Sequence, residues 1–238
     1  MGYLSPAKYE KRQQKAGPAR CSPPASSSTR RGARRPFARR CGARFVVADR
    51  LCGFARFFAD CEGAGNADGR TLVEACADGW WYTTGLPGGR RVAACLSDAD
   101  LARRLRLSDA GEWSRRLAAT SHVGAALRGA RALGPLTVCA ASSRRLDSAA
   151  GSGWLAVGDA ASTFDPLSSA GIVKALRSGI FASYAIADLL AKGDERALER
   201  YRSFVREEFA GYARVRDRHY ATERRWPESE FWRRRLEA

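Results

Sequence analysis

The stretch from Gly153 to Leu176, GWLAVGDAASTFDPLSSAGIVKAL, constrains the fold more than any other part of the chain. Its apolar run at 154–157 is too short for a helix and predicts a buried strand. Gly158 and Asp159 follow that strand, and a flexible backbone next to a carboxylate suits a turn that holds a polar ligand. Small residues then lead into a helix whose first N–H groups have no partners within it. An ordinary strand–turn–helix connection fits the same pattern.

The sequence GDAA, followed by DPLSSAG and an apolar helix, resembles the second flavin-binding motif of FAD-dependent monooxygenases and of the related flavin-dependent halogenases. The resemblance implies that Asp159 holds the ribityl chain and that Pro166 lies near the isoalloxazine ring. It also implies that the N–H groups of Gly171 and Ile172 face the pyrimidine edge of the ring. The cofactor-binding residues assigned in this way are Gly158, Asp159, Pro166, Ser169, Gly171 and Ile172.

Residues 45–141 contain most of the predicted strands, since apolar and aromatic residues recur there in short runs. The turn-rich segment 60–69 predicts a surface loop. Pro87, Gly88 and Gly89 predict a hairpin connection within an antiparallel sheet. Helices are predicted over 98–107 and 109–133. The predicted strands are 45–48, 50–58, 71–77, 79–86, 90–97 and 136–141.

Trp80, Trp81 and Tyr82 are consecutive in one predicted strand, so their side chains alternate between the two faces of the sheet. At least one ring should be buried, and another is a candidate for lining a substrate cavity. Packing of all three rings is the alternative. In the resembled family this sheet forms the substrate domain that covers the flavin.

The sequence departs from the halogenase pattern of two Trp and an Ile-Pro pair. Tyr82, Thr84, Leu86 and Pro87 occupy the comparable run. Ala170 stands where halogenases carry a hydroxyl beside the halide. These two departures weigh against a chlorinating role.

Two long helices are predicted near the C-terminus, the first ending at Gly193 and the second at about 195–220. Small and apolar residues of the first helix recur three and four positions apart, which predicts one face that packs against a sheet and a cofactor. Trp226 and Trp232 follow among several Arg, where they would either stack on nucleic acid or pair with Arg inside the domain. The predicted apolar face consists of Ile172, Ala175, Leu176, Gly179, Ile180, Ser183 and Ile186.

The formal net charge of +16 is concentrated in the first 44 residues, which hold twelve Lys or Arg and one Glu. Their Pro, Ser, Gly and Arg content predicts an extension that does not order itself, with a nucleic-acid-binding arm as the alternative. Residues 1–17 also bear a weak resemblance to the C-terminus of insertion-sequence transposases, which implies a rearranged gene.

Other features exclude some classes of protein. No apolar run reaches the roughly 18 residues of a membrane span, and the basic N-terminus has no apolar secretory core. The seven Cys lack CxxC spacing, so we expect no metal site and predict reduced, mostly buried thiols of a cytoplasmic protein.

We therefore predict an α+β protein, with a partial FAD-binding domain of the glutathione-reductase type, an antiparallel substrate sheet and long C-terminal helices. The expected domains are the extension 1–44, the substrate sheet 45–150 and the flavin-binding part 151–238. The resemblance implies an FAD-dependent monooxygenase, reduced by NADH or NADPH, that hydroxylates an aromatic or peptide substrate. No catalytic residue is assigned.

The expected G-x-G-x-x-G turn between a strand and a helix is missing from the sequence. We therefore expect a truncated chain with impaired or no activity. We expect no membrane partner, and nucleic-acid contact only through the basic extension. A non-catalytic nucleic-acid-binding protein is the alternative function.

Overall fold

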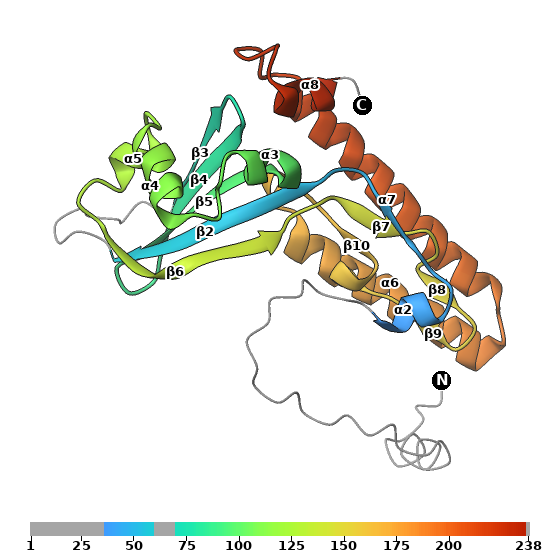
Figure 1. The fold of residues 1–238 in the computed structure, drawn as a ribbon. Coiled ribbons are helices and arrows are strands. Elements are labelled where there is room, and N and C mark those ends of the chain that lie inside the picture. Colours follow the sequence, from blue (N-terminus) through green and yellow to red (C-terminus); the bar gives the residue numbers. More distant parts are fainter. Residues whose placement is uncertain (1–35, 60–69, 237–238) are drawn as a thin grey trace. The chain divides into compact units, whose positions relative to one another are not determined.

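The computed structural model describes residues 36–59 and 70–236 (Figure 1). Contacts divide the chain into two units, residues 1–31 and 32–238, and everything described below belongs to the second. Most of the predicted extension 1–44, the transposase-like segment and the predicted loop 60–69 lie outside the described residues. The domain boundaries given above stay predictions.

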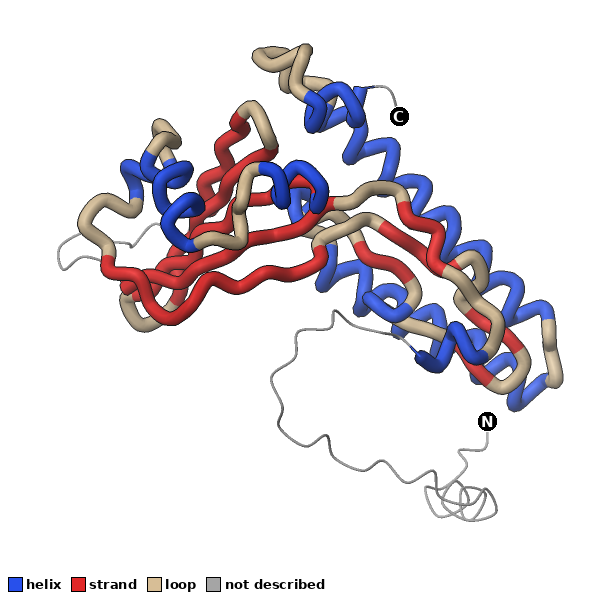
Figure 2. Tube along the Cα trace, in the orientation of Figure 1, coloured by secondary structure: helices blue, strands red, loops and turns tan. Residues whose placement is uncertain are grey.

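An antiparallel five-stranded sheet forms the first layer, with the order β3-β4-β5-β2-β6 (Figures 1 and 2). The predicted strand runs in this part of the chain are confirmed, although β6 begins at Arg131 and not at residue 136 as predicted. The predicted hairpin is confirmed as well, with Thr84 opposite Val92 on either side of the turn at Pro87. The strands are β2 (Leu51–Ala59), β3 (Thr71–Cys76), β4 (Gly79–Leu86), β5 (Arg90–Asp98) and β6 (Arg131–Ala140).

The two faces of this sheet bury different cores. On one face Trp81 packs against Trp113, their ring centroids 5.1 Å apart, among residues of α4 (Ala110–Ala118) and α5 (Val123–Ala126). On the other face Trp80 packs with Tyr220 and with α8 (Glu230–Leu236). The sheet is therefore covered on both sides. The short helix α3 (Ala99–Arg104) contributes Ala102 to the first core and Leu101 to the second.

The predicted helix 109–133 is wrong, because the chain breaks between α4 and α5 and becomes strand β6 at Arg131. Glu74 of β3 reaches the break, and its carboxylate accepts the N–H groups of Ser121, His122 and Val123 at 2.6–2.9 Å. These three donors belong to the start of α5, which would otherwise leave them without partners. A carboxylate from a distant strand thus fixes where the second helix begins.

A second layer contains two small sheets and the long C-terminal helices. One sheet has the order β1-β7-β10 and the other pairs β8 with β9. Two 3₁₀ turns lie between β9 and the first long helix. The elements are α2 (Pro36–Arg40), β1 (Phe45–Val47), β7 (Arg144–Leu146), β8 (Ala150–Gly151), β9 (Trp154–Leu155), η1 (Gly158–Ala160), β10 (Ser162–Thr163), η2 (Pro166–Ser168), α6 (Gly171–Lys192) and α7 (Arg196–Tyr220).

The buried strand predicted at 154–157 is much reduced. Only Trp154 and Leu155 form β9, and both are half-buried. Val157 is 40% exposed. The reason is that β9 pairs only with β8 among the described residues, so no larger sheet encloses it.

The apolar face predicted for α6 exists, but it points away from the rest of the described chain. The residues of α6 that are buried are Lys174, Ser178, Ala182 and Ala185. Large apolar residues such as Leu176, 64% exposed, lie on the remaining surface. The periodicity identified the face correctly, whereas the expectation that this face packs against the sheet was wrong.

Five Cys lie in the described residues, and all are free. Only Cys95 is buried, so the prediction of mostly buried thiols was wrong for this part of the chain. Burial raises the pKa of Cys76, which is half-buried, to about 11 and therefore keeps that thiol protonated.

Across residues 36–59 and 70–236, no helix combines the length and apolar character needed to cross a bilayer.

Substituting Glu74→Gln should lower the free energy of unfolding at neutral pH by about 1 kcal/mol, the usual scale for a helix cap. Burial alone would raise the pKa of Glu74, yet its three backbone hydrogen bonds hold this pKa below the ordinary value of 4.5. The contribution is therefore complete above that value and is lost as the pH falls through the native pKa. Urea unfolding of both proteins between pH 7 and pH 3 should show the difference shrinking with acid.

The matched control is Glu199→Gln, which changes an exposed carboxylate of α7 that pairs with Arg202. This control should alter stability by less than about 0.5 kcal/mol. A difference between the wild type and Glu74→Gln that stays constant down to pH 3 would contradict the role of the carboxylate.

Candidate functional site

The turn η1 is held tightly against α6. Gly158 is buried and has a φ of +57°, in the left-handed region that favours glycine. Its N–H donates to Ser178 Oγ at 2.7 Å. A Cβ at this position would lie 3.4 Å from the Cβ of Ala175. The close neighbour of Gly158 in the structure is therefore α6 itself.

The next residue, Asp159, forms an ion pair with a buried lysine. Lys174 Nζ donates to Asp159 Oδ1 at 2.7 Å and to the carbonyl oxygen of Ser162 at 2.6 Å. The same ammonium lies 5.3 Å from the ring centroid of Phe164. Only 2% of the Lys174 side chain is exposed, compared with 72% of the Asp159 side chain. The cation is therefore buried, while its carboxylate partner faces solvent.

The lysine that binds this carboxylate belongs to the first turn of α6. Lys174 comes three residues after Gly171, a rise of about 4.5 Å along a helix. The N-cap residue of α6 is Ala170, whose side chain makes no cap hydrogen bond. Ser169 immediately before it has a φ of +50°, a strained conformation for a residue with a Cβ.

The predicted cofactor-binding residues lie in η1, in and directly after η2, and at the start of α6. Pro166 begins η2, with Asp165 Oδ1 accepting the N–H of Leu167 at 2.9 Å. Of the six residues predicted, only Gly158 is buried. The other five, Asp159, Pro166, Ser169, Gly171 and Ile172, are exposed. Their contact with a flavin stays a prediction.

A buried hydrogen-bond chain connects this region to the large sheet. Trp80 Nε1 donates to the Tyr220 hydroxyl at 3.0 Å, and that hydroxyl donates to Asp165 Oδ2 at 2.7 Å. The N–H of Asp165 donates to the Tyr212 hydroxyl at 2.7 Å. Burial raises the pKa of Asp165 above its ordinary value, although the hydroxyl of Tyr220 opposes the shift. Asp165 therefore links the turn before α6 to strand β4.

The three aromatic residues of β4 take different positions. Trp80 and Trp81 lie on opposite faces, as predicted, and both are buried. Trp81 lines a cavity of about 350 Å³ that includes Cys76 and Arg116. Tyr82 is half-buried and lies 6.1 Å from Trp80 between ring centroids. A substrate-lining role for these rings stays a prediction.

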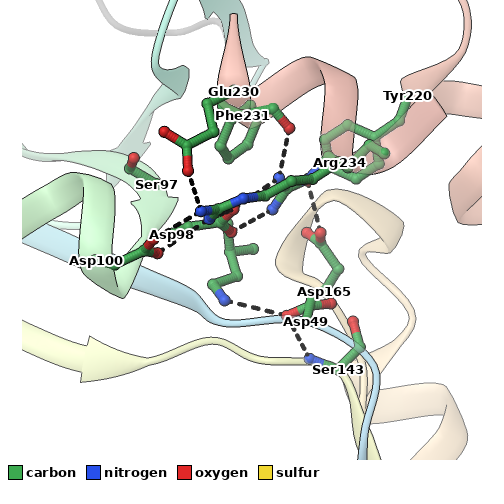
Figure 3. A network of polar contacts seen from close by, with 12 residues as sticks. Asp49, Ser97, Asp98, Asp100, Ser143, Asp165, Tyr220, Glu230, Phe231 and Arg234 are labelled. Atoms are coloured by element: carbon green, nitrogen blue, oxygen red, sulfur yellow. Dashed lines mark hydrogen bonds and ion pairs between the residues drawn. The ribbon is translucent and has the colours of Figure 1, made fainter. Parts of the chain in front are cut away.

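A second polar cluster joins α8 to the end of β5 (Figure 3). Asp98 is 3% exposed, and its carboxylate forms ion pairs with Arg234 at 3.0 Å and with Arg235 at 2.7 Å. Arg234 also pairs with Asp100 and with Glu230. Hydrogen bonds from Arg234 hold the pKa of Asp100 well below its usual range. The positive charges of the two arginines are thus largely neutralised by the carboxylates of the same cluster.

A cavity of about 540 Å³ lies beside this cluster, lined by Asp98, Arg234, Arg235, Arg216 and a short segment at 47–50.

The aromatic residues near the C-terminus pack within the described chain. Trp226 stacks on Trp232 at 6.2 Å, and the Arg225 guanidinium lies 4.4 Å from the Trp226 ring. The intramolecular alternative for this tail is therefore the one present in the structure.

Sequence reasoning identified Asp165 only as part of a turn with Pro166, and it missed three other residues that shape the region, Lys174, Tyr212 and Tyr220. Lys174 had a signal, because it is a charged residue in an otherwise apolar helical stretch and must find a partner if it is buried. Tyr220 had none, since its partner Trp80 lies 140 residues away in the sequence.

No protein-family model matches the chain. Over 195 residues the chain is 34% identical to the protein of Marinomonas mediterranea named "Putative FAD-dependent oxidoreductase LodB". The chain is a relative of FAD-dependent oxidoreductases. The match covers 82% of this chain and 51% of LodB, so the chain spans about half the length of this relative.

Solved structures of flavin-dependent enzymes share the fold. CmlS, a flavin-dependent halogenase, matches with a TM-score of 0.74 and 24% identity, over 84% of this chain and 38% of CmlS. The myxobacterial halogenase CndH matches with a TM-score of 0.72 and 20% identity, over 81% of this chain and 46% of CndH. The peptidyl tryptophan dihydroxylase QhpG matches with a TM-score of 0.65 and 27% identity, over 80% of this chain and 45% of QhpG. The mixture of helices and antiparallel sheet thus resembles the matched part of the flavin-dependent halogenase fold, which is less than half of each of these chains.

Removing the exposed partner of the Lys174–Asp159 pair should cost more stability than removing the buried one. Asp159→Ala leaves the Lys174 ammonium buried without its counter-charge, and we expect a loss of about 3 kcal/mol. Lys174→Met removes the donor to the solvated Asp159 carboxylate and to the buried Ser162 carbonyl, and it should cost about 1–2 kcal/mol. Thermal and urea unfolding of the two variants in flavin-free buffer measures the order.

The control is Asp188→Ala, which removes a surface carboxylate paired with Lys192 and Arg200 and should cost less than about 1 kcal/mol. If Lys174→Met proves more destabilising than Asp159→Ala, then packing of the lysine stem outweighs the charge.

Proposed function

We propose that this chain forms the ribityl-binding and ring-binding part of the FAD site in an oxidoreductase. The observation that carries the proposal is the Asp159 carboxylate, held by Lys174 within about one turn of the uncapped start of α6. The relationship to LodB, named as FAD-dependent, supports FAD as the cofactor. We further propose that the region around η1, β10 and α6 corresponds to part of an FAD-binding domain of the glutathione-reductase type.

The groups present fit a flavin by their chemistry. Lys174 occupies Asp159 Oδ1, and the exposed carboxylate keeps oxygen lone pairs to accept from ribityl hydroxyls. The N–H groups at Gly171 and Ile172 would donate to the electron-rich edge of the ring, which the positive end of the α6 dipole favours. FAD would supply the redox chemistry, and the protein would supply position and electrostatics.

The substrate side of the site belongs to the large sheet. We propose that Asp165, fixed by Tyr220 and Trp80, holds the Pro166 turn in place under that sheet. The substrate would be an aromatic molecule or a peptide, as QhpG acts on peptidyl tryptophan, and the reductant NADH or NADPH. Hydroxylation is favoured over halogenation because Ala170 offers no hydroxyl at the start of α6. The cytoplasm is the compartment proposed for these free thiols.

The test is to measure flavin binding by the purified 238-residue chain, with quenching of flavin fluorescence as the signal. Because the proposed contacts involve only the ribityl chain and the ring, riboflavin and FAD should bind with similar affinity. Asp159→Ala should weaken both by about tenfold to a hundredfold, the scale of one charged hydrogen bond.

Asp188→Ala serves as the matched control, since it removes a carboxylate from the other end of α6 and should leave both affinities unchanged. Circular dichroism checks that the Asp159→Ala variant is folded at the assay temperature. Absence of riboflavin binding, or binding that ignores Asp159→Ala, would count against the proposed site.

A further inference from the structure

A cavity of about 540 Å³ lies between α3, the start of α4 and the strands β2 and β6. Its volume is within the roughly 300–1,000 Å³ typical of small-molecule sites. Phe54 and Ala102, which line it, belong to the same core as Trp81. The Pro166 turn is joined to the opposite face of the sheet, through Trp80. The cavity is therefore separate from the proposed flavin site. Its lining residues are Cys52, Phe54, Ala99, Ala102, Arg103, Arg106, Ser108, Asp109 and Val138.

The inner wall of the cavity is apolar. Phe54 and Ala102 are buried core residues, and Cys52 and Val138 pack against the same core. Burial raises the pKa of Cys52 above its ordinary value, which keeps the thiol uncharged at neutral pH. A molecule that filled the cavity would replace water along this wall, so the part of the molecule that faces the wall should be apolar.

The charged side chains that line the cavity carry an excess of positive charge. Arg103, Arg106 and Asp109 together have a net charge of +1. Asp109 is the N-cap of α4, and its Oδ1 accepts the N–H of Glu112 at 2.8 Å. Neither arginine side chain has a hydrogen-bond or ion-pair partner among residues 36–59 and 70–236. Two guanidinium groups without partners at the edge of an apolar wall suit a carboxylate, which a guanidinium can bind through two parallel hydrogen bonds.

Arg106 occupies a backbone position that usually belongs to glycine. The helix α3 ends in a Schellman motif, in which the N–H of Leu107 donates to the carbonyl oxygen of Ala102 at 2.9 Å. The N–H of Arg106 donates to the carbonyl oxygen of Arg103 at 3.1 Å, as the same motif requires. Arg106 has a φ of +53°, which is strained for a residue with a Cβ. Strain of this kind concentrates at functional sites.

The end of a helix offers a second reason for a cation, because its carbonyl groups carry partial negative charge. Arg103 and Arg104 already lie in the last turn of α3. Arg104 does not line the cavity and forms an ion pair with Glu230 of α8. If Arg106 served only the helix end, its replacement would change stability and nothing else. A ligand site predicts an effect on binding, with a different sign for stability.

We propose that this cavity binds a small amphiphilic monoanion, a carboxylate on a short apolar body. The carboxylate would meet Arg103 and Arg106, and the apolar body would cover Phe54 and Val138. The single excess positive charge of the lining sets the charge of the ligand, and the wall sets its apolar part. The proposal goes beyond the proposed function and does not depend on it.

The experiment is isothermal titration calorimetry of the purified 238-residue chain at neutral pH, with octanoate as the probe. The neutral analogue 1-octanol and the cationic analogue octylamine have the same apolar chain. Octanoate should bind at least about tenfold more tightly than 1-octanol, the scale of one charged hydrogen bond. Octylamine should bind no more tightly than 1-octanol, because its charge has the sign of the two arginines.

Two variants at one position separate charge from backbone strain. Arg106→Gln removes the charge and keeps a Cβ at the strained position, and it should weaken octanoate binding about tenfold. Arg106→Gly should weaken binding to the same extent and raise Tm by about 2 °C, since glycine adopts this φ without strain. Arg104→Gln is the matched control on the same helix and should leave octanoate affinity unchanged. Circular dichroism verifies that each variant is folded.

Three outcomes overturn the proposal. The first is octanoate that does not bind, or that binds no more tightly than 1-octanol. The second is octanoate binding that Arg106→Gln leaves unchanged, in which case a loss of stability assigns Arg106 to the helix end. The third is an equal loss of binding in Arg104→Gln, because the overall charge of α3 would then account for the attraction.

Discussion

The buried ammonium of Lys174 is the interaction on which the candidate site depends. It reaches from the first turn of α6 to Asp159 and to the carbonyl of Ser162, so one cation joins the helix, η1 and β10. A buried charge is tolerated only when it is paired and hydrogen-bonded. The turn must therefore stay where the lysine can reach it. Gly158 adds a second attachment through Ser178, again to the same helix.

The sheet was predictable because its signals are local. Short apolar and aromatic runs and the Pro87 turn define strands and a hairpin within a few positions of one another. The break between α4 and α5 was not predictable in the same way. It depends on Glu74, whose carboxylate arrives from 47 to 49 residues away and competes with helix continuation at Ser121 to Val123.

In the candidate site as well, local features were predictable from the sequence and distant contacts were not. The GDAA and DPLSSAG segments pointed to a turn and a helix start, and in the structure η1 packs on α6, which begins at Gly171. Sequence periodicity also found the apolar stripe of α6, but periodicity carries no information about which neighbour a stripe meets. In the described chain, small residues such as Ala182 and Ala185 pack inward instead, because they allow close contact with α7.

The chain of contacts from Trp80 through Tyr220 to Asp165 has a mechanical consequence. Apolar layers slide past one another at little cost, but directional bonds buried away from water resist sliding, since breaking one leaves a donor or acceptor without a partner. The end of α7 therefore fixes the position of the Pro166 turn relative to β4. If a bound molecule shifted β4, the Pro166 turn would therefore move with it, and the side chains between them would not simply repack.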